Sequence, residues 1–172
     1  MIDNEISELP VNIMKIAKAA GIRVLKNSEV GLLSGSESGL CVFENGTWHL
    51  IYDDEAYKGR RRVIIAHELG HIFLGHELMQ GNHEQTFNTR KPKSEEQADA
   101  FAIRLLAPAG VLWGLNLHTW EDIADMCGIS KAEARKRADR METLYKRQKF
   151  LTSSLEKQVY KQFEEFINEN KK

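Results

Sequence analysis

One short run constrains this chain more than any other: the pentapeptide His-Glu-Leu-Gly-His at positions 67–71, inside the otherwise apolar segment 63–74. The argument for a metal site applies if this run is helical. In a helix, four residues turn roughly 400° and rise about 6 Å, so His67 and His71 leave the same face one turn apart. Two imidazoles so placed can bind one metal ion, and zinc accepts neutral imidazole nitrogens at about 2.0–2.1 Å.

Glu68 stands between these histidines and projects about 100° from His67. That direction is wrong for a third ligand but suits a base that takes a proton from a water activated by the metal. The pattern H-E-x-x-H is a signature of zinc metallopeptidases. This pattern fixes only three positions and can therefore occur by accident. The zinc hypothesis requires a third ligand from elsewhere in the chain.

Composition narrows the classes of protein that need to be considered. The 172 residues are 42% hydrophobic and 28% charged, which is typical of a globular protein with a proper core. A net charge of −1 gives the whole molecule no attraction to nucleic acid or anionic lipid. Cys41 and Cys127 lack metal-binding spacing and indicate free thiols in a reducing compartment. With neither a signal peptide nor a membrane span, we expect a cytoplasmic protein without membrane contact.

Local patterns place the main elements. Asn45-Gly46 between the β-rich segments 40–44 and 47–52 predicts a tight hairpin. Ser94 with Gln97 predicts a capped helix. Two further helices are predicted in the C-terminal part, capped by Thr119 and by Ser130 with Glu133.

The helix that Ser94 opens offers the third ligand. Glu95 and Asp99 continue the apolar stripe of this helix, and a buried carboxylate needs a partner. Zinc would be that partner for Glu95, while Asp99 would accept the free ring N–H of a ligating histidine. Acidic residues in a first turn stabilise any helix by roughly 0.3–1 kcal/mol per charge, so Glu95 alone proves nothing. Glu96 is the rival ligand, but it points about 100° away and has no aspartate four residues later.

The other histidines have weaker claims. His76 is out of register with the longer pattern that uses a third histidine, and we interpret it as a surface or helix-end residue rather than a ligand. His83 lies in the polar segment 81–93, which is long enough to be a lid, and it is a candidate substrate contact. The strand 47–52, ending at Tyr52, is a candidate edge on which an extended substrate could add.

Taken together, the motifs resemble the ImmA/IrrE family of metallo-endopeptidases. The resemblance rests on the pentapeptide and on the pattern E-x-x-A-n-x-F-A-x-x-L-L-x-P from Glu95 to Pro108, in which Ala107 replaces a frequent methionine. It implies an α+β, zincin-like domain with a small sheet packed on the active-site helices, which we place at 1–118. C-terminal helices then occupy 119–172. The same resemblance implies one zinc ion held by His67, His71 and Glu95.

The predicted function is therefore zinc-dependent endopeptidase activity with Glu68 as the general base. The family resemblance implies a regulatory substrate, a helix-turn-helix repressor of a mobile element or of a stress response. Two other hypotheses stay open. The first is a zinc-stabilised protein that binds a repressor without cutting it. The second is DNA binding by the segment 123–149, which resembles a helix-turn-helix and carries eight basic against three acidic residues from position 131 on.

Overall fold

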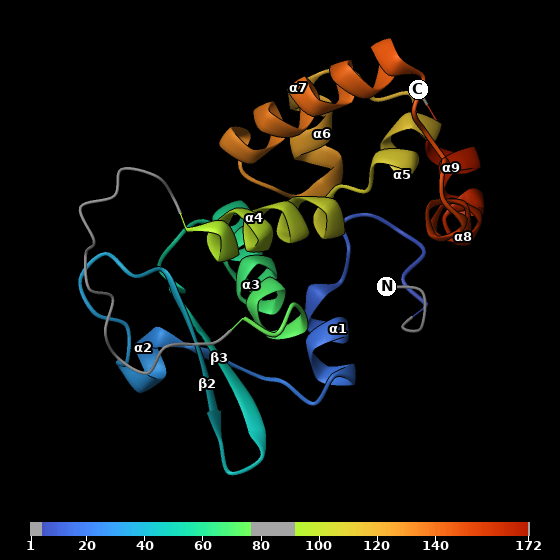
Figure 1. Ribbon diagram of the computed structural model, residues 1–172. Coiled ribbons are helices and arrows are strands. Elements are labelled where there is room, and N and C mark those ends of the chain that lie inside the picture. The colour runs from blue at the N-terminus through green and yellow to red at the C-terminus, as the bar shows by residue number, and fades with distance from the viewer. Residues whose placement is uncertain (1–4, 77–91, 172) are drawn as a thin grey trace.

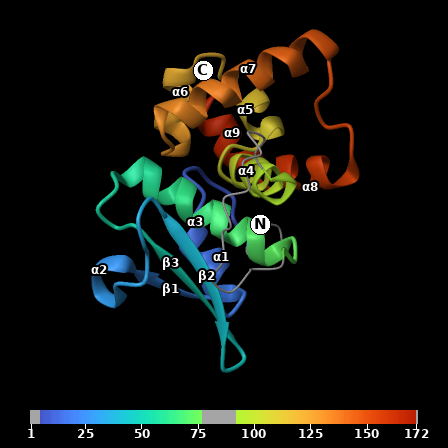
Figure 2. The same ribbon diagram turned by 60° about the vertical axis from the view of Figure 1, so that its left-hand side comes forward.

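The computed structural model describes residues 5–76 and 92–171 and has an α+β architecture, which confirms the predicted fold class. A small sheet and α1 (Ile13–Ala19) lie at one end of the molecule (Figure 1). The helices α3 (Lys58–Phe73) and α4 (Lys93–Leu106) cross the middle, and the later helices lie at the opposite end. Figure 2 shows the same separation after a 60° turn.

The sheet has the strand order β1-β3-β2. Its members are β1 (Arg23–Lys26), β2 (Gly39–Glu44) and β3 (Thr47–Tyr52), with β1 parallel and β2 antiparallel to β3. Asn45 and Gly46 have φ values of 50° and 77°, as a two-residue hairpin turn requires, so the predicted hairpin is confirmed. The prediction that Thr47–Tyr52 is an edge strand is wrong. Pairing on both sides makes β3 the central strand, and among the described strands β2 lies at an edge.

The two long helices of the middle layer carry the motifs. In α3, Ile64, Ile65 and Leu69 are buried, and this helix contacts β2, β3 and α4. The cap predicted at Ser94 is wrong: α4 starts two residues earlier than that cap implies, with Pro92 in the N-cap position and no side-chain cap. Ser94 therefore lies inside the first turn, where its hydroxyl is not needed as a cap.

Six more helices lie in the described part of the chain, and α7 is the longest of them. They are α2 (Asn27–Val30), α5 (Ala109–Gly114), α6 (Trp120–Cys127), α7 (Lys131–Arg147), α8 (Ser154–Gln162) and α9 (Glu164–Asn170). The predicted N-caps Thr119 of α6 and Ser130 of α7 are confirmed, since their hydroxyls accept backbone N–H groups at 3.1 and 3.2 Å. The Glu133 carboxylate, predicted to complete a capping box, forms an ion pair with Lys136 at 2.8 Å. Gly128, in the left-handed region at φ 61°, ends α6 and turns the chain into α7.

One hydrophobic core connects the two predicted regions, although the boundary at residue 118 stays a prediction. Leu50, Leu69, Ile123 and Phe163 are all essentially inaccessible to solvent and belong to the same cluster. Arg62 adds a polar connection, because its Nη2 donates to the carbonyl oxygens of Val11 at 2.8 Å and Cys127 at 3.4 Å.

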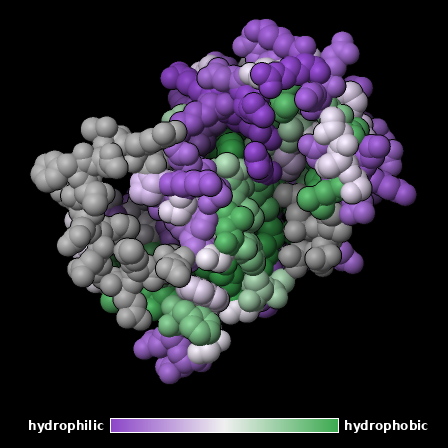
Figure 3. All heavy atoms as spheres, in the orientation of Figure 1, coloured by the Kyte–Doolittle hydropathy of each residue, from purple (hydrophilic) through white to green (hydrophobic). Residues whose placement is uncertain are grey.

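The outer surface over α7 is strongly hydrophilic, whereas apolar side chains come to the surface nearer the middle layer (Figure 3). Within the described ranges, none of the helices combines the length and the apolar character that crossing a membrane requires.

Candidate metal centre

Close packing of α3 against α4 brings the two motifs together. A Cβ placed on Gly70 would lie 3.2 Å from the Cα and the carbonyl oxygen of Ala98, closer than most side chains tolerate. Glycine at this position of the pentapeptide therefore lets the helix backbones approach. As a result, His67 and His71 on α3 face Glu95, in the first turn of α4.

Three electron-pair donors converge between these helices. The Nε2 atoms of His67 and His71 are 3.0 Å apart. One carboxylate oxygen of Glu95 lies 3.3 Å from His67 Nε2, and the other lies 3.2 Å from His71 Nε2. The three side chains are only 18%, 9% and 31% exposed, in the order His67, His71, Glu95, so water screens them poorly.

These distances fit a zinc ion. A tetrahedral ion with bonds of about 2.0–2.1 Å holds its ligand atoms about 3.3 Å apart, close to the observed separations. The chemistry of the donors points the same way. His67 Nδ1 lies 2.8 Å from Asp99 Oδ1, so the ring donates its Nδ1 proton there and a neutral ring presents a lone pair at Nε2. The two Nε2 lone pairs and the carboxylate of Glu95 would repel one another at these distances unless a cation lay between them.

The charges of the cluster perturb its titration. Burial lowers the pKa of His67, but the hydrogen bond to Glu95 and the carboxylates of Glu68, Glu95 and Asp99 outweigh it, so the net shift is upward. When no cation separates them, ring N–H groups of His67 and His71 donate hydrogen bonds to Glu95, and these hold the pKa of Glu95 well below its usual range. Glu95 is therefore ionised at neutral pH, as a zinc ligand must be.

Glu68 lies in a tight pocket between α3 and β2. It is 9% exposed, and the Cys41 thiol lies 3.3 Å from its Oε2. A Cβ on Gly39 would come within 2.6 Å of its Oε1, so only glycine lets the strand pass this close. Burial raises the pKa of Glu68, and the hydrogen bond from Cys41 and the nearby histidines oppose that rise. Neither contact of β2 with Glu68 is visible as a motif in the sequence.

The remaining predicted residues lie in different places. Tyr52 is half-buried on the central strand, directly opposite Gly39 in the register, and its role in substrate binding stays a prediction. His83 lies outside the described residues. Glu96 belongs to an exposed part of α4 and is not part of the group that can hold a metal.

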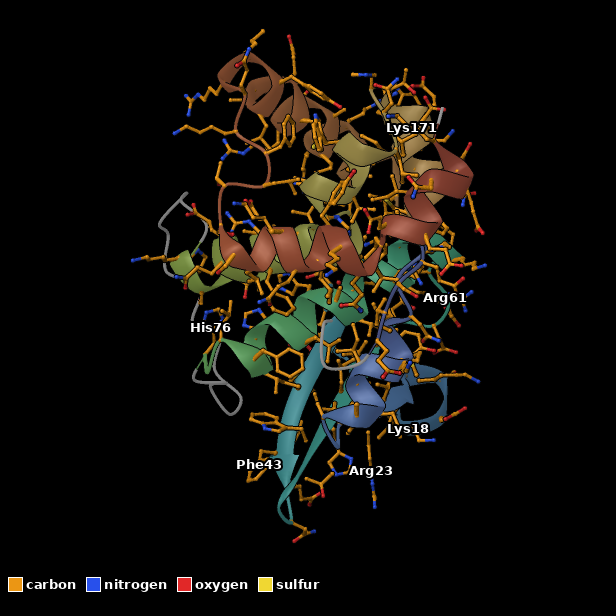
Figure 4. The ribbon with its side chains drawn as sticks, turned by 90° about the vertical axis from the view of Figure 1, so that its right-hand side faces the viewer. Lys18, Arg23, Phe43, Arg61, His76 and Lys171 are labelled. Atoms are coloured by element: carbon orange, nitrogen blue, oxygen red, sulfur yellow. The ribbon has the colours of Figure 1, made fainter. Side chains whose placement is uncertain are left out.

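Sequence reasoning missed the surroundings of His71. His76 was interpreted as a surface or helix-end residue, and it does follow the end of α3. However, it is half-buried, and its Nδ1 lies 3.1 Å from His71 Nδ1. Figure 4 shows His76 at the C-terminal end of α3. A spacing pattern identifies ligands but not the partners of ligands, so no available pattern would have found this contact.

The basic segment after Gly128 has fewer side chains free to bind nucleic acid than its composition suggests. Arg137 is only 5% exposed, and burial lowers its pKa to about 10. The guanidinium of Arg135 lies over the Trp120 ring, 4.6 Å from its centroid. Lys136 and Lys146 each form an ion pair with a glutamate of the same helix. Arg137 is one of the eight basic residues on which the DNA-binding hypothesis rests, and its burial removes it from any exposed basic patch. DNA binding stays an untested hypothesis.

Comparison with known proteins identifies a family. The model of the family Peptidase_M78, described as the IrrE N-terminal-like domain, matches residues 17–139. This range includes all of the candidate metal ligands together with Gly39, Cys41 and Glu68. No curated protein and no solved structure gives a match to the chain.

Proposed function

The chain belongs to the Peptidase_M78 family, the IrrE N-terminal-like domain, and on that premise we propose that it is a zinc-dependent endopeptidase acting on a regulatory protein. Family membership by itself supports a metallopeptidase-type function. The observation that carries the proposal further is the convergence of two Nε2 atoms and one carboxylate within 3.0–3.3 Å of one another. That donor set suits zinc with one position left open for catalysis.

His67, His71 and Glu95 would hold the ion. Zinc, when bound, lowers the pKa of water from about 15.7 toward 7 and polarises a carbonyl group. Glu68 supplies the acid–base chemistry: its carboxylate takes a proton from the attacking water and returns it to the departing amine. The raised pKa of Glu68 supports this role, because a base works best when its pKa approaches the working pH.

The edge of β2 is our candidate for the substrate-binding surface. In the part of the chain that the structure describes, β2 pairs with β3 alone, and its opposite edge has free backbone groups. This strand also contacts Glu68 through Gly39 and Cys41. An extended substrate segment added to this edge would lie beside the general base and would gain main-chain hydrogen bonds.

We propose a helix-turn-helix repressor as the substrate class, which is what the resemblance to the ImmA/IrrE family implies. The test is to purify the chain, measure bound zinc, and incubate it with candidate repressors encoded near its gene. Glu68→Gln should keep zinc and lose cleavage. Glu95→Gln should lose zinc, while the matched variant Glu96→Gln, on the exposed side of the same helix turn, should behave as wild type.

Two outcomes would contradict the proposal. Cleavage that persists in Glu68→Gln would remove the assigned base. Repressor binding without cleavage by the zinc-loaded wild type would instead favour a zinc-stabilised binding protein.

A further inference from the structure

The chain after α3 turns back onto the metal centre. Leu74 ends the helix, and Gly75 adopts the left-handed conformation at φ 65°. The N–H of His76 then donates to the carbonyl of His71 at 3.1 Å, and the N–H of Gly75 donates to that of Ile72 at 3.2 Å. This pair of bonds is the Schellman motif, which commonly ends helices. Here it places the imidazole of His76 over the last turn, beside His71.

His76 uses both of its ring nitrogens in this position. Its Nδ1 lies 3.1 Å from His71 Nδ1, and its Nε2 lies 3.2 Å from Oε1 of Gln97. The two rings meet edge to face, with centroids 5.0 Å apart and planes at 73°. A chain of contacts therefore runs from His71 on α3 through His76 to Gln97 on α4.

With zinc bound to Nε2 of His71 and both rings neutral, this chain has one consistent order of protons. His71 directs Nε2 at His67 and Glu95, where the ion would bind, so in the zinc-bound site its proton lies on Nδ1 and His76 Nδ1 accepts it. The proton of His76 must then lie on Nε2, where the Gln97 carbonyl oxygen accepts it. Each donor meets an acceptor, and the lone pair of His71 points to the metal position.

We propose that His76 is a positioning residue of the metal centre: by accepting the Nδ1 proton of His71, it fixes the tautomer and orientation of that ligand, and Gln97 fixes His76. The inference rests on the proposed function of the site. In this role His76 accepts the Nδ1 proton of His71, just as Asp99, 2.8 Å from His67 Nδ1, accepts the proton of His67. His76 is not a fourth ligand, because both of its nitrogens face other side chains and it lies outside the His67, His71 and Glu95 group.

Zinc affinity of the whole chain, measured by competition with a chromogenic chelator, tests the proposal without any substrate. His76→Phe keeps an aromatic ring but removes the acceptor, and it should weaken zinc binding about 10–100-fold, as loss of such partners typically does. His76→Asn can present an amide oxygen near the Nδ1 position and should recover most of the affinity. His118→Phe, a matched change at an exposed histidine of the α5–α6 connection, should have no effect.

Thermal unfolding of the zinc-free proteins separates positioning from general stability. His76→Phe should unfold at the same temperature as wild type when both are zinc-free, and at a lower temperature when both are loaded. Wild-type zinc affinity in His76→Phe would overturn the inference, as would equal losses in His76→Phe and His76→Asn. Failure of the zinc-loaded wild type to cleave any repressor would count against the proposed function alone, because zinc affinity is measured without substrate.

Discussion

Adding one methyl group at Gly39 should disable the general base while leaving the metal site intact. In Gly39→Ala, the new Cβ would lie 2.6 Å from Oε1, 2.8 Å from Cγ and 2.9 Å from Cδ of Glu68. The main chain at Gly39 is not in the left-handed region, so alanine fits the backbone and the clash falls on the carboxylate. Relief to an ordinary contact of about 3.4 Å requires the side chain of Glu68 to move by about 0.8 Å.

The displacement of the Glu68 side chain determines the expected loss of activity. A misplacement of about 1 Å at a reacting group can cost about 100-fold, so we expect kcat/KM to fall about 100-fold, or about 2.7 kcal/mol in the activation free energy. Overpacking should also lower the free energy of unfolding by about 1–3 kcal/mol. Zinc content should stay at the wild-type level, because the three atoms nearest to the new Cβ all belong to Glu68 and none belongs to a candidate zinc ligand.

The assay is cleavage of a fluorogenic peptide or repressor, with zinc measured on the same sample. Gly110→Ala is a suitable control, since its new Cβ meets the flexible end of Leu151 at 2.9 Å, remote from Glu68. A second test is the pair of Glu68→Asp alone and combined with Gly39→Ala. The shorter side chain should relieve the clash, so the methyl group should cost little in that background. Wild-type kcat/KM in Gly39→Ala, or parallel loss of zinc, would refute the reasoning.

Three other predictions concern the general base, the core and the metal. Cys41→Ala removes a donor that stabilises the Glu68 carboxylate, so the pKa of Glu68 should rise and the acid limb of the kcat/KM profile should move to higher pH; an unchanged profile would show that the thiol has no influence. Phe163→Ala should lower the free energy of unfolding by about 3–5 kcal/mol in a single transition, because this fully buried ring belongs to the common core; two separate transitions in denaturant would indicate independent domains on either side of residue 118. Removing zinc with a chelator should lower the melting temperature, and adding zinc back should restore it. At a free zinc concentration of 100 Kd, binding should stabilise the fold by about 2.7 kcal/mol. A melting temperature that does not change with zinc would argue against the site.

Elements specified by local chemistry were predictable from the sequence. The Asn45-Gly46 turn and the caps at Thr119 and Ser130 depend on residues that lie within a few positions of one another. The cap at Ser94 is wrong because Pro92 occupies the N-cap position, and the first turn then starts two residues earlier, at Lys93.

The sequence by itself determined which side chains would line the candidate metal centre, because helix geometry fixes the spacing of His67 and His71, and of Glu95 and Asp99. Only the tertiary structure decided what surrounds them. Strand order made β3 central and put β2 beside Glu68, and a helix-ending turn brought His76 onto His71. These contacts depend on where whole elements pack, which the periodicity of a single helix or strand does not encode.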